Sequence, residues 1–280
     1  MIRPLFKLIL ISITCCFIFI GSGCKKSGCM NPLATNFDAE ADKDDGSCIL
    51  PITEDTTETV EIRFVPTMNG EPFAPNQAFI GPNNLRMNME TFKFYLSDIA
   101  LTGSAGTNVL RDVAFIDFPS SKSIFINAAP GNYSAISFGL GVKKSLNGTG
   151  DTEYNPAQWA DTHPLSIYKG MYWTWASGYI FTKLEGRIDT SQTQDQQPNF
   201  SWFYHIGMDT TYTTKTIEGL TINAVEGQTT VLKLGIEVND LFRTNADTIN
   251  MTMDYFTHTT DNLNLALKVM NNLKVSIRKI

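Results

Sequence analysis

Cysteine is absent from the long stretch between Ile49 and Ile280, and histidine occurs only three times in the whole chain. The first absence excludes disulfides and thiolate metal ligands from that stretch. Any site for a soft metal there must use His, Met or a modified aromatic side chain. The chain also has no Gly-rich phosphate loop, no serine-nucleophile elbow and no His-Glu-x-x-His sequence. No enzyme class is indicated, and we expect a protein that binds rather than catalyses.

Positive charge is also scarce, because 22 Lys and Arg stand against 28 Asp and Glu, which gives a formal net charge of −6. If residues 1–23 were removed as a signal, Arg3 and Lys7 would be lost and the charge would be 20 − 28 = −8. An acidic chain of this kind is a poor partner for nucleic acid. We therefore expect no nucleic-acid partner.

The amino terminus has the pattern of a lipoprotein signal peptide over residues 1–23. Two basic residues precede an apolar run from Leu8 to Ile20, and three small residues then lead into Cys24. The alternative is a short membrane span, but the run is well below the ~20 residues that cross a bilayer. The small residues before Cys24 resemble a bacterial lipobox, which makes Cys24 the lipidation candidate. We expect an exported lipoprotein of the outer membrane that faces the periplasm or the cell surface.

Two cysteines remain once the signal and the lipidation candidate are set aside. Cys29 and Cys48 are expected to form a disulfide in an oxidising compartment. The segment between them resembles a cysteine-bracketed acidic motif of secreted Bacteroidetes-type proteins, and residues 24–58 are expected to form this module and a linker. Its acidic residues suggest calcium, since hard oxygen ligands suit that ion; the alternative is a solvated acidic turn. The candidate ligands are Asp38, Asp42, Asp44 and Asp45.

Residues 59–280 show short extended runs separated by turn signals, with alternating apolar and polar residues and many β-branched and aromatic side chains. This pattern predicts an all-β fold, an antiparallel β-sandwich of one domain. The candidate strands are Val60–Val65, Arg86–Leu101, Val113–Phe118, Ser123–Ile126, Tyr133–Gly139, Met171–Leu184, Phe200–Ile206, Lys215–Ile222, Thr230–Val238 and Thr248–Met253. Apolar residues at helical spacing predict one short C-terminal helix over Asp261–Asn272, capped by Thr260 or Asp261.

The sequence M-Y-W-T-W at 171–175 concentrates two of the four tryptophans beside a methionine. On an extended strand Met171, Trp173 and Trp175 would project from one face. Paired aromatic side chains on one face of a strand are also typical of a sandwich core, and we expect core packing for at least one of them. Methionine, likewise, more often fills gaps in a core than binds a metal.

Several fragments follow one another along residues 64–274 in a recognisable order. They are F-V-P-T-M-N-G-E-P-F (64–73), Y-L-S-D-I-A-L (95–101), I-D-F (116–118), G-N-Y-S-A-I-S-F-G-L-G-V (131–142), M-Y-W-T-W (171–175), K-L-E-G (183–186), H-I-G (205–207) and N-N-L-K (271–274). Together these fragments resemble the MbnP-like (methanobactin-partner) family of copper-binding proteins.

The resemblance implies copper binding outside the cytoplasm by histidine nitrogens and, in some members, by a tryptophan oxidised to kynurenine. Imidazole is a good copper ligand when it is neutral. His205 is the first candidate ligand. For His258, a ligand and a loop residue are equally expected. For His163, which stands beside Pro164, a loop residue is the more common role. The full set of metal candidates is His205, His258, His163, Met171, Trp173 and Trp175.

The leading interpretation is therefore a lipid-anchored protein that sequesters copper or hands it over, with a redox or copper-delivery protein as a further partner. The alternative is a metal-free surface sandwich that binds carbohydrate or peptide through an aromatic face. Glu185 is the best acidic candidate for a buried role, although a structural ion pair is the more common role for such a residue.

Overall fold

The computed structural model describes residues 25–32, 34, 36–48, 60–174, 176–244 and 247–280. The chain divides into two compact units, Met1–Glu54 and Asp55–Ile280. The expected signal peptide, Cys24 and Trp175 lie outside the described residues. Among the residues that are described, no helix is long and apolar enough to cross a membrane.

The small unit is held by one parallel strand pair and one disulfide. Strand β1 (Ser27–Gly28) pairs with β2 (Lys43–Asp44), and Cys29 is bonded to Cys48. The predicted disulfide is confirmed. It closes a loop of a unit that contains few apolar residues, and in the chain-entropy model such a closure contributes about 3 kcal/mol.

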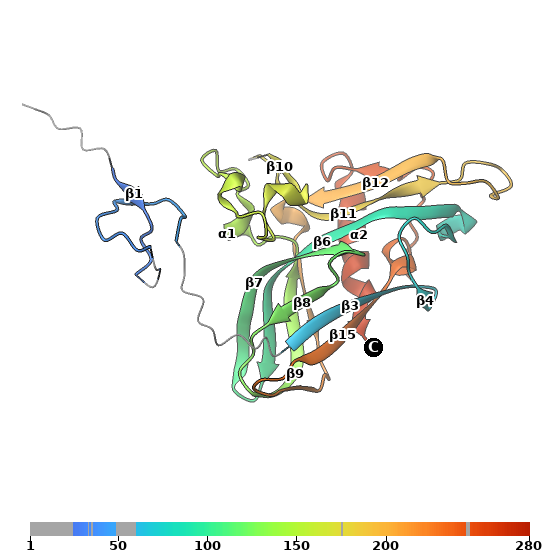
Figure 1. Cartoon of the computed structure of the whole chain (residues 1–280). Helices are drawn as coiled ribbons and strands as arrows, with labels where there is room; N and C mark the ends of the chain where they lie inside the picture. Colours follow the sequence, from blue (N-terminus) through green and yellow to red (C-terminus); the bar gives the residue numbers. More distant parts are fainter. Residues whose placement is uncertain (1–24, 33, 35, 49–59, 175, 245–246) are drawn as a thin grey trace, which may run out of the picture. The chain divides into compact units, whose positions relative to one another are not determined.

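The large unit is a sandwich of a ten-stranded and a five-stranded sheet (Figure 1). The ten-stranded sheet follows the order β13-β9-β6-β11-β12-β16, with β10, β14, β5 and β7 attached at its sides. Its strands are β5 (Phe79–Ile80), β6 (Arg86–Gly103), β7 (Gly106–Phe118), β9 (Gly131–Leu140), β10 (Tyr172–Thr174), β11 (Gly178–Ile188), β12 (Phe200–Gly207), β13 (Thr213–Ile217), β14 (Ile222–Ala224) and β16 (Phe256–Thr257).

The five-stranded sheet follows the order β17-β15-β3-β4, and β8 also pairs with β3. Its strands are β3 (Val60–Met68), β4 (Glu71–Pro72), β8 (Ser123–Ile126), β15 (Thr230–Glu237) and β17 (Ile277–Lys279). Most neighbouring strands in the large unit are antiparallel, but β15 with β3 and β12 with β16 are parallel. The predicted all-β sandwich is confirmed, and its sheets are mixed rather than wholly antiparallel.

The core lies between the two sheets and is rich in aromatic rings. Phe64 of the five-stranded sheet meets Phe94 of the ten-stranded sheet edge to face, with ring centroids 5.7 Å apart. Phe92 and Trp202 extend this layer and are almost completely buried. Aromatic pairs in this geometry contribute about 0.5–1.5 kcal/mol beyond the apolar area they bury. The alternation of buried and exposed residues along β12 follows from this core, because Trp202, Tyr204 and Ile206 point inward.

The predicted strand Thr248–Met253 is wrong, because this segment folds into turns. Ile249 and Met251 are buried, as the alternation suggested. The side chain of Asn250 accepts hydrogen bonds from the backbone N–H and the hydroxyl of Thr252, and its carbonyl accepts from Met253 N–H. An asparagine can close a turn in this way and so end an extended run.

Two other predicted strands are interrupted. The Met171–Leu184 run divides into β10 and β11, and Gly178 at the junction has φ of 69° with its Cα against Asn147. A side chain at this glycine would collide with Asn147, so the turn depends on its absence. The run Lys215–Ile222 divides into β13 and β14 around Gly219, which also has positive φ.

The C-terminal helix, α2, spans Leu263–Ser276 and packs against strands of both sheets (Figure 1). Its buried face carries Leu265, Val269 and Leu273, at helical spacing. The predicted caps are wrong, because Asn262 caps the helix through a hydrogen bond from Leu265 N–H to its side-chain oxygen. The other helical segments are short: α1 (Lys144–Asn147), η1 (Pro82–Asn84), η2 (Pro156–Gln158), η3 (Ile167–Lys169), η4 (Asp209–Thr211) and η5 (Val238–Leu241).

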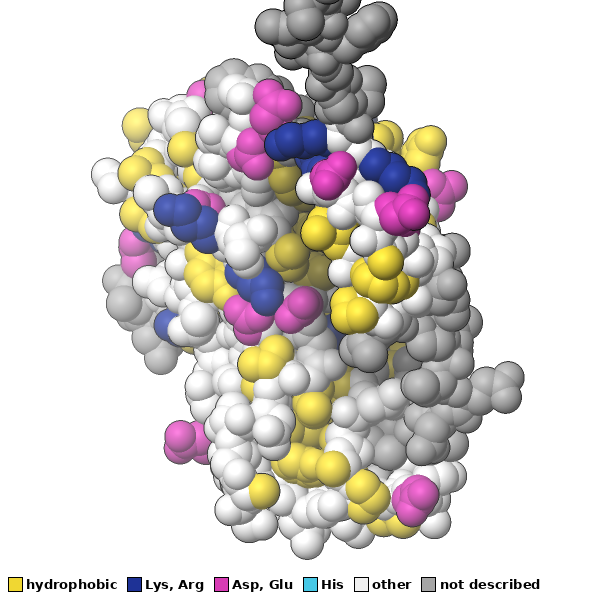
Figure 2. Space-filling model, turned by 90° about the vertical axis from the view of Figure 1, so that its left-hand side faces the viewer, with side chains coloured by type: hydrophobic (Ala, Val, Ile, Leu, Met, Phe, Trp, Pro, Cys, Tyr) yellow, Lys and Arg dark blue, Asp and Glu magenta, His cyan; other side chains and the backbone are white. Residues whose placement is uncertain are grey.

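The charged side chains on the face shown in Figure 2 are mixed in sign, with Lys and Arg lying beside Asp and Glu and hydrophobic side chains between them. Ion pairs such as Lys93 with Asp117 and Lys143 with Asp98 have the same character. No extended basic surface is visible among the residues coloured there. A surface of this kind does not provide the positive stripe that nucleic acid needs.

The cap assignment predicts that Asn262→Ala lowers the free energy of unfolding by about 1 kcal/mol, because it leaves an amide of the first turn without a partner. Urea denaturation of the mature chain measures this change. Thr260→Ala is the matched control, and we expect it to alter the stability by less than about 0.5 kcal/mol. Equal losses for the two variants would contradict the assignment of the cap.

Candidate metal centre

His205 lies on the outer face of the large sheet because its neighbours Tyr204 and Ile206 point into the core. Strand β16 pairs in parallel with β12, with Phe256 beside Phe203 and Thr257 beside Tyr204. One step further in this register is His258, so the two histidines come to the same side of the sheet. Their ring centroids are 5.3 Å apart.

The segment after β16 is fixed by a chain reversal at Thr259. This buried residue has φ of 68°, which is unusual for a β-branched side chain. Its hydroxyl oxygen accepts a hydrogen bond from Gly207 N–H at 2.9 Å, and its own N–H donates to the Thr257 hydroxyl at 3.1 Å. These bonds hold His258 close to the end of β12.

Two aromatic rings flank the pair of imidazoles. Trp173 on β10 lies 6.4 Å from His205 and 6.1 Å from His258, measured between ring centroids. Phe203 lies 5.3 Å and 5.0 Å from the same two rings. The side chain of His205 is 17% exposed and that of His258 is 45% exposed. The two imidazoles are therefore partly enclosed by apolar rings and open to solvent on the His258 side.

Each imidazole is bonded to a carboxylate. His205 Nε2 lies 2.8 Å from Glu185 Oε1, and His258 Nδ1 lies 2.8 Å from Asp261 Oδ2. Glu185 also accepts from the Thr91 hydroxyl. The hydrogen bond with His205 is the main cause that lowers the pKa of Glu185 to about 2, and the hydrogen bond with His258 lowers the pKa of Asp261. Both carboxylates are therefore ionised at neutral pH.

An ionised carboxylate can only accept hydrogen bonds, so each histidine must donate from the nitrogen that faces it. In the neutral ring this leaves a lone pair on His205 Nδ1 and on His258 Nε2. Neither atom has a hydrogen-bond partner within the described part of the chain. Carboxylate–histidine pairs of this kind set the tautomer and orientation of metal-binding imidazoles.

His163 is not in contact with the other two histidines. Its ring stacks on Trp159 at 4.1 Å, and its Nδ1 accepts a hydrogen bond from Leu165 N–H at 3.1 Å. Burial, followed by the nearby charges of Arg111 and Lys169, lowers the pKa of His163. The structure gives this histidine a packing role in the loop between η2 and η3.

Met171 is fully buried in the core, and the structure records no hydrogen bond or ion pair for its side chain. Among the described residues, no three His, Cys, Asp or Glu side chains gather as a metal site. The donors that the described chain offers at the centre are therefore two imidazole nitrogens beside Trp173. Imidazole nitrogens suit copper, and two of them on neighbouring rings suit an ion that accepts few ligands.

Sequence reasoning identified His205, His258, Trp173 and Glu185 but missed the contributions of Asp261 and Phe203. Asp261 was expected to cap the helix, whereas it bonds both the N–H and the Nδ1 of His258. The spacing His258-x-x-Asp261 was the available signal. Phe203 stands two residues before His205, on the same face of the strand.

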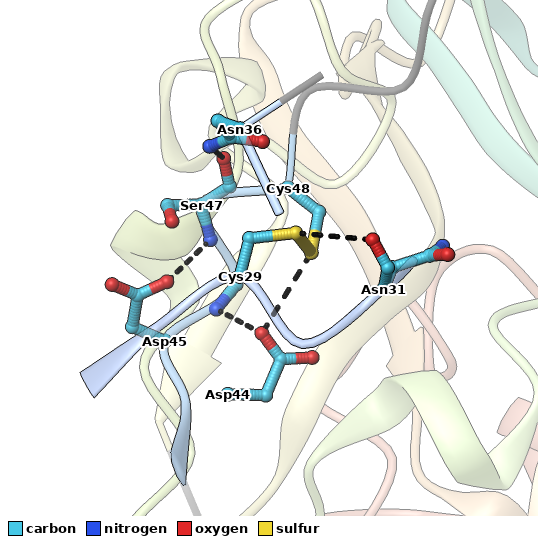
Figure 3. Close-up of a disulfide and its surroundings, with 8 residues drawn as sticks. Cys29, Asn31, Asn36, Asp44, Asp45, Ser47 and Cys48 are labelled. Atoms are coloured by element: carbon cyan, nitrogen blue, oxygen red, sulfur yellow. Dashed lines mark hydrogen bonds between the residues drawn. A yellow bond between two sulfur atoms is a disulfide. The ribbon is translucent and has the colours of Figure 1, made fainter. Parts of the chain in front are cut away.

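The aspartates of the small unit bond to its own backbone and to Lys26. Figure 3 shows Asp44 beside the disulfide and Asp45 bonded to Ser47. The Lys26 ammonium lies 2.9 Å from Asp38, and Lys26 N–H donates to Asp42. Asp44 accepts from Gly46 N–H and Asp45 from Ser47 N–H. These contacts are those of turn-closing carboxylates, and calcium in this loop stays a prediction.

A model of the MbnP family matches residues 57–265. No curated protein matches the chain. Among solved structures, MbnP from Methylosinus trichosporium is similar over 71% of this chain and 82% of its own, with 16% sequence identity and a TM-score of 0.47. The family match covers well over half of the 280 residues and confirms the resemblance seen in the sequence. The chain belongs to the MbnP family, and so to a group of copper-related proteins associated with methanobactin.

Proposed function

We propose that this chain is a non-enzymatic copper-binding protein in which His205 Nδ1 and His258 Nε2 hold the ion. The observation that carries the proposal is the pair of imidazoles 5.3 Å apart, each fixed by its own carboxylate. When bound, the copper ion supplies an electrophilic centre that takes up both lone pairs. The chain's own residues orient the rings, exclude water on the Trp173 side and leave the His258 side open for exchange of the ion.

The charges around the pair favour a monovalent ion. Glu185 and Asp261 are each bonded to an imidazole, and Lys183 lies 3.3 Å from Glu185, so three ionised groups act on the pair. Their sum is +1 − 1 − 1 = −1. Cu(I) neutralises this charge, whereas Cu(II) leaves an excess of one positive charge in a partly buried place. We therefore expect Cu(I) to be the preferred state.

Among the tryptophans that the structure describes, Trp173 is the one in ring contact with both His205 and His258, and it is our candidate for the kynurenine found in some relatives. Its oxidation needs dioxygen, whose two atoms open the pyrrole ring, and water, which then removes the formyl group as formate. A redox partner protein would assist this step. Intact-mass measurement of protein from its native host reports the change.

We propose that the protein sequesters copper or hands it over outside the cytoplasm. The signal-like residues 1–23 support export, and a disulfide between Cys29 and Cys48 is typical of oxidising compartments. An acyl chain on Cys24 would attach the protein to the outer membrane, since each buried methylene contributes about 0.8 kcal/mol.

The copper site predicts one equivalent of Cu(I) per mature chain. Competition with a colorimetric Cu(I) chelator measures the affinity. We expect His205→Ala and His258→Ala each to weaken binding by more than about 100-fold, because even loss of a supporting carboxylate costs 10–100-fold. His163→Ala is the matched control and should bind like the wild type. Equal affinities for all four proteins would contradict the proposal.

Glu185→Gln should weaken Cu(I) binding by about 10–100-fold and should flatten the dependence of stability on acid pH. The pKa of Glu185 in the folded chain is about 2, against its usual value near 4.5. Because the folded value is lower, the carboxylate stabilises the fold fully above pH 4.5, and this contribution is lost as the pH falls toward 2. The melting-temperature gap between wild type and variant should therefore shrink over that interval.

Thermal unfolding of metal-free protein between pH 7 and pH 2.5 measures this gap. Glu153→Gln is the control, since Glu153 is exposed and its side chain forms no ion pair with a described residue. A gap that stays constant down to pH 2.5 would exclude the stabilising role of the ionised Glu185.

The lipid anchor predicts that Cys24→Ala abolishes incorporation of labelled fatty acid and moves the protein out of the membrane fraction of the native host. Cys16→Ala, within the apolar run of the signal, is the control and should keep the label. Undiminished labelling of the Cys24 variant would exclude this residue as the anchor.

A further inference from the structure

A cavity of about 470 Å³ lies apart from the candidate metal centre, where the edge strands β7 and β8 of the two sheets meet the segment 162–169. Its volume is in the range of sites that take small organic ligands. Phe115, Phe125 and Pro164 contribute apolar surface, and Ala114 and Ile124 are buried beneath it. Phe115 packs against Tyr95 in a tilted arrangement, with ring centroids 5.1 Å apart.

Two cations line this cavity from different elements, Arg111 from β7 and Lys169 from the end of η3. The guanidinium of Arg111 is fixed by donating to the carbonyl oxygens of Val113 and Phe125 at 3.3 and 2.9 Å. The ammonium of Lys169 forms no ion pair or hydrogen bond with any residue that the structure describes. Both charges also act on the nearby His163, whose pKa they help to lower.

The acidic residue of the lining, Asp117, is already paired with Lys93 at 3.1 Å. The cavity is thus positive in a chain whose net charge is −6. Ser120 and Thr162 add hydroxyl groups to the lining, and neither hydroxyl is hydrogen-bonded within the described residues. Free donors of this kind, beside a cation that lacks a partner, suit a carboxylate.

The register of the large sheet separates this cavity from the copper centre. His205 lies opposite Lys183, Lys183 opposite Lys93, and Lys93 opposite Asp117. Opposed residues point to the same side of a sheet, so the two places share one face. Three strand spacings of about 4.8 Å put His205 and Asp117 roughly 14 Å apart.

We propose that the cavity is a binding site for a small organic carboxylate with an apolar or aromatic body. Lys169 and Arg111 receive the carboxylate, with the Ser120 and Thr162 hydroxyls as additional donors, and the body lies against Phe115. This site is independent of the proposed copper site, and both can be tested in the same protein.

The experiment uses the mature chain after removal of metal by a chelator, and it compares 2-naphthoate with its neutral analogue 2-naphthamide by saturation-transfer NMR and calorimetry. We expect the carboxylate to bind at least about tenfold more tightly, because a charge-assisted hydrogen bond is stronger than a neutral one. Lys169→Gln should remove most of that difference, and Arg111→Gln should do the same. Lys144→Gln, at an exposed lysine that does not line the cavity, is the matched control and should change nothing.

Lys169→Gln decides the outcome, since the Lys169 ammonium forms no ion pair or hydrogen bond with a described residue, whereas Arg111 also binds two backbone carbonyls. Equal affinities for the two probes would overturn the proposal. Absence of binding for both up to several millimolar, or undiminished binding of 2-naphthoate to the Lys169 variant, would also overturn it. The copper titration is performed separately, so failure of one site does not affect the reading of the other.

Discussion

Parallel pairing of the short strand β16 with β12 is the contact on which the candidate centre depends. It involves only two residues of β16, and it is reinforced by the hydrogen bond from Phe203 N–H to the Tyr255 carbonyl at 2.9 Å. The Tyr204 hydroxyl also donates to the Asp254 carbonyl at 2.6 Å. Once these backbones are aligned, the alternation of side chains places His258 beside His205.

The two ionised carboxylates then determine which nitrogen of each imidazole carries the lone pair. Glu185 connects three strands, since it lies on β11, accepts from Thr91 on β6 and bonds His205 on β12. Its low pKa keeps it an acceptor at all physiological pH values. The nitrogen of His205 that faces it must carry a proton, so the other nitrogen carries the lone pair. Asp261 imposes the opposite assignment on His258, and the two rings present different nitrogens.

The sequence alone could predict those parts of the fold that depend on local pattern. The disulfide followed from counting, because two cysteines remained after the signal and Cys24 were assigned. The strand Phe200–Ile206 that carries His205 followed from its extended pattern, and α2 followed from its apolar spacing. These features need only near neighbours in the chain.

The rest depends on contacts between distant segments, which no local pattern records. Strand β16 is too short to show an alternation, and the reversal at Thr259 uses positive φ at a residue type that rarely adopts it. Asn250 likewise closes a turn within a run whose sequence pattern predicts a strand. A different residue, Asn262, caps α2, and this leaves Asp261 free to bond His258.

The position of the pair at the edge of the ten-stranded sheet explains why the centre is only half enclosed. An edge strand of two residues offers few unpaired backbone groups, so the fold can leave it uncovered without inviting another chain to pair there. The same exposure keeps His258 accessible while His205 stays sheltered behind Trp173 and Phe203. A structural metal site is closed by four protein ligands. In the proposed site, two ligands at an open edge would hold an ion less completely, and an ion held in this way could be passed on without unfolding the sheet.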